Sequence, residues 1–186
     1  QKGTKVALFG KGTADYVKGG GGSGDVICAY TRSLCDGLRI KQKEGKAELF
    51  EELAQFYEEN IRAQYADGAS PGMTAEPEVP SELFEKARAY TDTAIITISR
   101  FSGEGWDRKT VVNGSYRLDR NEQKMFDLSS KLFEDGDFSL TKAERNMVQA
   151  VTDAFAKVIV VLNIGGMCET AWIRDNDRIQ AALFAG

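Results

Sequence analysis

Short apolar runs alternate with longer amphipathic stretches along the chain. The apolar runs are typical of buried strands, and we expect strands at residues 5–10, 93–99, 158–164 and 178–184. Apolar residues at helical spacing, with polar residues between them, predict helices at residues 31–40, 46–66, 81–90, 119–135 and 141–155, and a last one ending near Trp172. Two pairs, Asp119 with Glu122 and Thr141 with Glu144, have the spacing of a capping box at a helix start.

This alternation predicts an α/β fold. Strands that are apolar throughout indicate a sheet covered on both faces, so we expect a three-layer α/β/α sandwich with a mainly parallel sheet of about five or six strands. Three glycine-rich loops, at residues 10–26, 100–109 and 165–167, each follow a predicted strand. In a parallel sheet such loops lie at the same edge, where binding sites form, so this edge is the predicted site.

Composition narrows the function classes. The chain has 186 residues, of which 42% are hydrophobic and 28% charged, which indicates one folded domain. Its net charge is −4 and no basic stripe is visible, so we expect no nucleic-acid partner. No apolar run approaches the roughly 20 residues needed to cross a bilayer, so we expect no membrane partner. A homo-oligomer is compatible with the sequence.

The chain contains no histidine, which removes Ser-His-Asp and Cys-His catalysis within it. Without histidine, and with no CxxC spacing among Cys28, Cys35 and Cys168, we expect no metal site and free thiols. Free thiols favour a cytoplasmic location. Secretion stays open as an alternative, because Gln1 is not a natural start and a leader can have been removed.

The segment KGGGGSGD, residues 18–25, is here called the glycine-rich loop. Gly19, Gly21 and Gly24 match G-x-G-x-x-G, yet a dinucleotide turn needs its first glycine directly after the strand, and this strand ends near Gly10. A Walker A loop does not fit either. Two interpretations remain open: the glycines make a tight crossing, or they let a ligand approach the backbone closely.

The second loop reads RFSGEGWDRK, and Glu104 lies in it between two glycines, where large neighbouring side chains are absent. A carboxyl in this setting can donate a proton if its surroundings raise its pKa. Trp106 can offer a flat apolar face to a sugar ring. The alternative is an exposed glutamate on a turn that Trp106 holds in place.

KGGGGSGDV, YEE at residues 57–59, ISRFSGEGWDRK and VVLNIG occur in this order over nearly the whole chain. This combination resembles the α/β sandwich domain of family 3 glycoside hydrolases, the β-glucosidase group. The stretch from Asn113 to Phe138 is longer than the usual link of that family, so we interpret it as an insertion that carries an extra helix.

The resemblance implies a retaining enzyme that removes terminal β-D-glucosyl or related residues from a β-glucoside or oligosaccharide, without a cofactor. In that family the sandwich domain closes the sugar pocket, and Glu104 matches the general acid/base. Ser23 matches the serine that reaches the sugar, and Trp106 is the further substrate-binding candidate. A partner domain, a (β/α)8-type barrel, supplies an aspartate nucleophile.

This sequence has no SDW motif for that nucleophile and stops at ALFAG, so we expect a fragment of a larger enzyme that is inactive alone. Two other classes remain as alternatives. One is a non-catalytic carbohydrate-binding or scaffolding module of the same fold. The other is a nucleotide-binding α/β protein.

Overall fold

The computed structural model describes residues 3–69, 72–103 and 130–185. In these residues one parallel sheet has five strands in the order β2-β1-β3-β4-β5. The strands are β1 (Thr4–Phe9), β2 (Ala47–Leu49), β3 (Thr93–Arg100), β4 (Lys157–Ile164) and β5 (Ile179–Phe184). The expected α/β/α sandwich with a parallel sheet is therefore confirmed.

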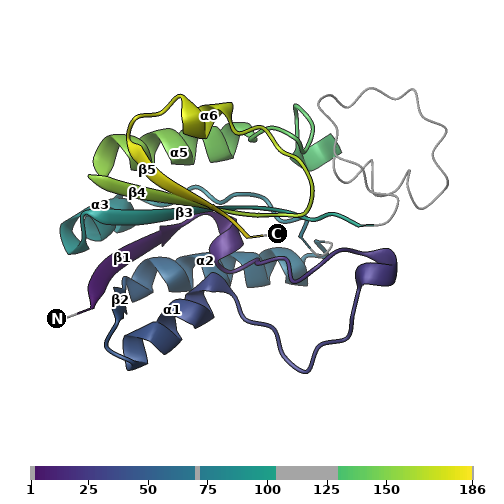
Figure 1. Ribbon diagram of the computed structural model, residues 1–186, viewed down its shortest axis with the longest axis horizontal. Coiled ribbons are helices and arrows are strands. Elements are labelled where there is room, and N and C mark those ends of the chain that lie inside the picture. Colours follow the sequence, from purple (N-terminus) through teal and green to yellow (C-terminus); the bar gives the residue numbers. More distant parts are fainter. Residues whose placement is uncertain (1–2, 70–71, 104–129, 186) are drawn as a thin grey trace.

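Helices cover both faces of the sheet (Figure 1). The helices are α1 (Leu34–Lys43), α2 (Glu51–Ala66), α3 (Ser81–Tyr90), α5 (Lys142–Ala154) and α6 (Ala171–Arg174). Figure 1 shows α5 and α6 on one side of the strands and α1 on the opposite side. None of the helices in the described ranges has the length and apolar character needed to span a membrane.

Two apolar clusters hold these layers together. The larger one joins β1, β3 and β4 to α3 and α5, and the rings of Phe9, Phe84 and Phe155 pack against one another in it. The smaller one joins the other face of β1 to Cys35 of α1. Because successive residues of a strand point to opposite faces, Ala7 and Phe9 enter the larger cluster while Val6 and Leu8 enter the smaller one.

The sequence prediction was wrong in one region and displaced in two others. The helix predicted at 46–66 begins only at Glu51, because Ala47–Leu49 form the edge strand β2. The helix predicted at 31–40 begins at Leu34, where Ser33 and Asp36 form a capping box that the sequence reading did not identify. The last helix is one short turn at Ala171–Arg174. The helix predicted at 119–135 and the insertion at 113–138 lie largely outside the described residues.

Gly10 directly follows β1 and has a backbone conformation that only glycine adopts easily, with φ +92. A Cβ added there would overlap with the carbonyl oxygen of Thr97 on the neighbouring strand β3. Gly45 has a similar φ of +73, but nothing lies within 4 Å of the position that its Cβ would take.

We therefore expect Gly10→Ala to lower the free energy of unfolding by about 3 kcal/mol and Gly45→Ala by about 1 kcal/mol. Both variants place alanine at a positive φ, and only the first also meets a neighbouring strand. Urea unfolding of the two variants measures the difference, and equal losses would show that the contact with Thr97 is unimportant.

Candidate functional site

The strand order sets the position of the site. From β1 the chain moves to β2 at one edge, whereas from β3 it moves to β4 and β5 toward the other edge. Loops that leave β1 and β3 at their carboxyl ends therefore diverge, and an open α/β sheet binds its ligands at such a point. The glycine-rich loop follows β1, and the segment with Ser102 and Gly103 follows β3.

These two loops are joined backbone to backbone. The Gly21 N–H donates to the Ser102 carbonyl oxygen at 3.0 Å, and Gly21 pairs with Gly103 as an isolated parallel bridge. A Cβ on Gly103 would lie 2.6 Å from the Gly21 nitrogen, and a Cβ on Gly21 would lie 2.8 Å from the Phe101 ring. Glycine at position 103 is thus required for this backbone contact, and glycine at position 21 leaves room for the Phe101 ring.

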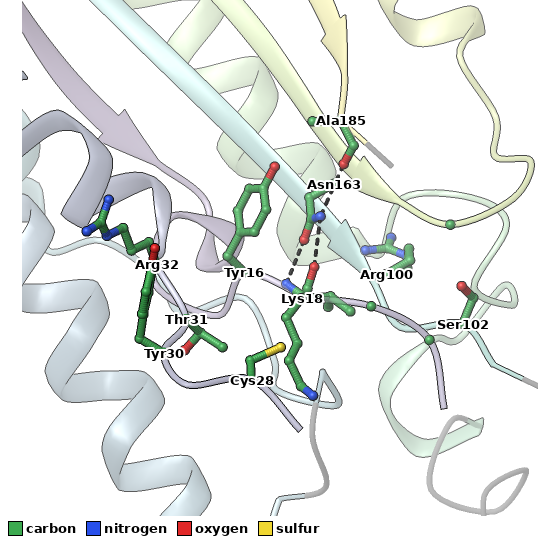
Figure 2. A pocket seen from close by; sticks show the side chains of 14 residues that line it. Tyr16, Lys18, Cys28, Tyr30, Thr31, Arg32, Arg100, Ser102, Asn163 and Ala185 are labelled. Carbon is green, nitrogen blue, oxygen red and sulfur yellow. Dashed lines mark hydrogen bonds between the residues drawn. The ribbon is translucent and has the colours of Figure 1, made fainter. Parts of the chain in front are cut away.

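The third loop reaches the same place. A Cβ on Gly165, just after β4, would overlap with the Ser102 hydroxyl oxygen. Residues of all three loops line one cavity of about 510 Å³, among them Tyr16, Lys18, Ser102 and Gly165. Figure 2 shows the labelled side chains around this cavity. The predicted convergence of the three loops is confirmed.

The glycine-rich loop is closed at its base. Lys18 forms a salt bridge with Asp25 at 2.9 Å and also donates to the Val26 carbonyl oxygen, so the two ends of KGGGGSGD are tied together. This pair is exposed and contributes little stability, but it fixes the ends of the loop. Between them, Gly22–Gly24 form a 3-10 turn that carries Ser23 on the exposed surface.

A buried ion pair fixes the end of β3, directly before this segment. The Arg100 guanidinium donates to both carboxylate oxygens of Glu144 at 2.6 Å, and both side chains are 2% exposed. Its remaining N–H groups donate to carbonyl oxygens of Ser99, Asp137 and Ser139. Burial raises the pKa of the Glu144 carboxyl, but the charge and hydrogen bonds of Arg100, together with Lys11 and the Thr141 N–H, outweigh burial and hold this pKa below its ordinary value.

Glu144 also caps the start of α5 from the first turn of this helix. Its carboxylate accepts from the Thr141 N–H at 2.8 Å, and the Thr141 hydroxyl accepts from the Glu144 N–H. The capping box predicted at Thr141 and Glu144 is therefore confirmed. The sequence reading did not anticipate that the same glutamate pairs with Arg100.

A second buried polar cluster lies under the start of the loop that follows β1. Lys11 is 1% exposed, its backbone N–H donates to Glu76 at 2.7 Å, and its ammonium group donates to the Thr74 carbonyl oxygen. Tyr57 donates to the other Glu76 oxygen at 3.1 Å. Burial raises the pKa of Glu76 to about 8, although the Lys11 N–H opposes this shift. Burial likewise lowers the pKa of Lys11.

Of the predicted site residues, the structure describes Ser23 and brings its loop against Gly103, the residue before Glu104. Glu104 and Trp106 lie outside the described residues, so their predicted roles stay predictions. In the described residues, the structure does not have the arrangement that a dinucleotide-binding turn needs. β1 ends at Phe9 and α1 begins only at Leu34, far from the glycines. A dinucleotide turn needs strand, glycines and helix in direct succession.

Comparison with known proteins decides the family. The sequence profile of the glycosyl hydrolase family 3 C-terminal domain matches residues 1–186. The chain belongs to this family. It is 49% identical, over its whole length, to β-glucosidase A of Butyrivibrio fibrisolvens, and it spans 22% of the length of that relative.

Solved structures agree with this family 3 assignment. β-Glucosidase 3B from Thermotoga neapolitana, in complex with glucose, superposes with a TM-score of 0.67 at 30% identity, over 98% of this chain and 23% of that one. A β-glucosidase from Paenibacillus barengoltzii gives 0.70 at 28% identity, over 97% of this chain and 18% of that one. The family 3 C-terminal domain of these enzymes therefore has the fold described above.

Gly103 and Gly24 allow a matched test of the contact between the loops. A Cβ at Gly103 meets the Gly21 backbone, whereas nothing lies within 4 Å of the corresponding position at Gly24. We expect Gly103→Ala to speed amide exchange of the Gly21 N–H by roughly fivefold or more, because a hydrogen bond of this kind contributes about 1 kcal/mol. Gly24→Ala should leave that rate unchanged, and equal rates in both variants would contradict the close packing.

Glu76 predicts a pH dependence. Its folded pKa of about 8 lies above the ordinary value, so between these two pKa values the folded state binds a proton that the unfolded state does not. The contribution of Glu76 to the free energy of unfolding is complete below the ordinary glutamate pKa. It is lost progressively as pH rises from there through about 8, by up to about 1.4 kcal/mol per pH unit.

Glu76→Gln should remove this decline. Urea unfolding between pH 5 and 8, compared with Glu78→Gln on the exposed side of the same segment, measures the effect. If the parent chain and Glu76→Gln show the same pH dependence, Glu76 does not titrate in this range.

Proposed function

We propose that this domain supplies the general acid/base of a retaining β-glucosidase and closes its sugar pocket. The whole enzyme removes terminal non-reducing β-D-glucosyl or related residues from β-glucosides or oligosaccharides. Glu104 is the acid/base, Ser23 offers a hydroxyl to the sugar, and Trp106 offers its flat apolar face. Membership of glycosyl hydrolase family 3 and the β-glucosidase relatives support this reaction class.

One observation of the structure supports the site most strongly: the backbone contact between the glycine-rich loop and the segment that leads to Glu104. Gly21 donates to Ser102, two residues before Glu104 in the sequence, and Ser23 follows two residues after Gly21. In this proposal the glycine-rich loop binds the substrate and the loop after β3 transfers the proton. The backbone contact fixes these two loops to each other. Glycines on both loops leave room for a sugar to approach the backbone.

The chemistry requires a second carboxyl group from a partner domain. Retaining hydrolysis uses two carboxyls about 5–5.5 Å apart, one attacking the anomeric carbon and the other protonating the leaving oxygen and then deprotonating water. Glu104 performs the second role. It must carry a proton in the free enzyme, and the charge of a nearby aspartate raises its pKa in that direction.

We propose that the aspartate belongs to a (β/α)8-type barrel domain of the same protein. The chain spans only 22% of β-glucosidase A, which leaves ample length in such a relative for a barrel. The glucose complex of the Thermotoga neapolitana enzyme supports glucose as the sugar held between the domains. A cytoplasmic location remains the prediction from the free thiols.

Replacing Glu104 in the full-length enzyme tests the proposal. Glu104→Ala should lower kcat/KM for an aryl glucoside with a poor leaving group by about 10²–10⁴-fold, because protonation of the leaving oxygen is lost. A dinitrophenyl glucoside, which leaves without a proton, should lose much less. With the dinitrophenyl glucoside, azide should restore turnover and give the β-glucosyl azide, because the small anion attacks the intermediate without a general base.

Glu169→Ala, which changes an exposed glutamate beyond β4, is the matched control and should retain activity. An unaffected rate in Glu104→Ala, or no rescue by azide, rejects the acid/base assignment. The 186-residue chain alone should show no turnover, since it lacks the nucleophile. Measurable affinity of this chain for glucose, combined with an unaffected Glu104→Ala enzyme, would instead favour a carbohydrate-binding module.

A further inference from the structure

Asn163 is a buried amide at the carboxyl end of β4, with an exposed fraction of 4%. It pairs in register with Ser99 of β3, and its side chain points away from the larger apolar cluster, which takes its neighbours Leu162 and Ile164. A buried amide must find hydrogen-bond partners, so its partners show what it holds in place.

Its first partner is the backbone just before the glycine-rich loop. The Asn163 Oδ1 accepts from the Val17 N–H at 2.7 Å, and the Asn163 Nδ2 donates to the Val17 carbonyl oxygen at 3.1 Å. Figure 2 shows these two bonds running side by side from the Asn163 amide. The side chain therefore binds Val17 as a neighbouring strand would, although no strand lies there.

The second partner is the end of β5. The other Nδ2 hydrogen is donated to the Ala185 carbonyl oxygen at 3.2 Å, and the Ala185 N–H donates to the Leu162 carbonyl oxygen at 2.8 Å. Both amide donors and the amide oxygen of Asn163 are thus used. Only one orientation of the amide fits, because the reversed one would place its NH₂ group against the Val17 N–H.

The glycine-rich loop is consequently attached to the sheet edge at two points, Val17 by Asn163 and Gly21 by Ser102. Ser23 lies just beyond the second point, in the exposed turn. Releasing Val17 would remove one of these two attachments, and the Lys18–Asp25 bridge cannot replace it, because it lies within the loop and moves with it.

We infer that Asn163 is a positioning residue of the sugar site: its amide is used by backbone partners, and through them it aligns the glycine-rich loop and Ser23. The inference rests on the proposed function, in which this loop contacts the sugar. It concerns a side chain on β4, outside both loops to which that function assigns chemistry.

Asn163→Asp in the full-length enzyme tests this. The carboxylate can still accept from the Val17 N–H, but it loses both donors and repels the carbonyl oxygens of Val17 and Ala185. We expect kcat/KM to fall by roughly tenfold or more, with a rise in KM, because misplacement of a positioning group by about 1 Å can cost about 10²-fold. Azide should not rescue this variant, and the pKa values seen in its kcat/KM–pH profile should match those of the parent.

A readout independent of activity is tryptic cleavage after Lys18, which should become at least fivefold faster when the loop is released. Asn146→Asp, an exposed change on α5, is the matched control and should alter neither cleavage nor kinetics. Should Asn163→Asp fail to fold, Asn163→Ser, which is smaller and uncharged, takes its place in both measurements.

The outcomes separate the two proposals. Cleavage and KM within twofold of the Asn146→Asp control would overturn the positioning role, as would a lower kcat with unchanged KM, which indicates only less folded enzyme. If Asn163→Asp behaves as expected while azide fails to rescue Glu104→Ala, the positioning role stands and the acid/base assignment falls.

Discussion

The ion pair between Arg100 and Glu144 is the constraint on which the site depends. Two charges at 2% exposure are tolerated only if their hydrogen bonds are complete, and here the guanidinium reaches both carboxylate oxygens and three carbonyl oxygens. Removing one partner of such a pair typically costs about 3–5 kcal/mol. The pair fixes the last residue of β3 to the first turn of α5, so the segment toward Glu104 leaves the sheet from a rigid position.

The strand order places a binding site beside this ion pair. Because the chain runs outward in opposite directions from β1 and β3, the loops after these strands diverge and leave space at the sheet edge. Glycine contacts then bring the tips together again, through Gly21 and Gly103. The cavity is therefore bounded by the ends of β3 and β4 on one side and by the glycine-rich loop together with residues 28–32 on the other.

The sequence predicted this architecture well where an apolar run or a fixed residue spacing gave the signal. The strands around Ile96 and Val160 contain runs of apolar residues, and Thr141 with Glu144 gave a capping signal that the structure confirms. β2 was missed because Leu49 and Leu53 continue one helical spacing across a three-residue strand. Asn163 gave no signal, since a single amide at a strand end has no pattern and its partner Val17 lies 146 residues away.

The glycines of KGGGGSGD divide into two groups with different physical reasons. A Cβ on Gly20 or Gly21 would press against Ser102 or Phe101, so these two permit the loop to be anchored. Gly22 has a φ of +69, a conformation that favours glycine, whereas no described atom lies within 4 Å of the position that a Cβ on Gly24 would take, and Ser23 between them is exposed. Packing and backbone conformation in the described residues therefore explain glycine at positions 20–22 and leave Gly24 unexplained. An open tip on an anchored base is what a loop needs if its remaining neighbour is a sugar held against another domain.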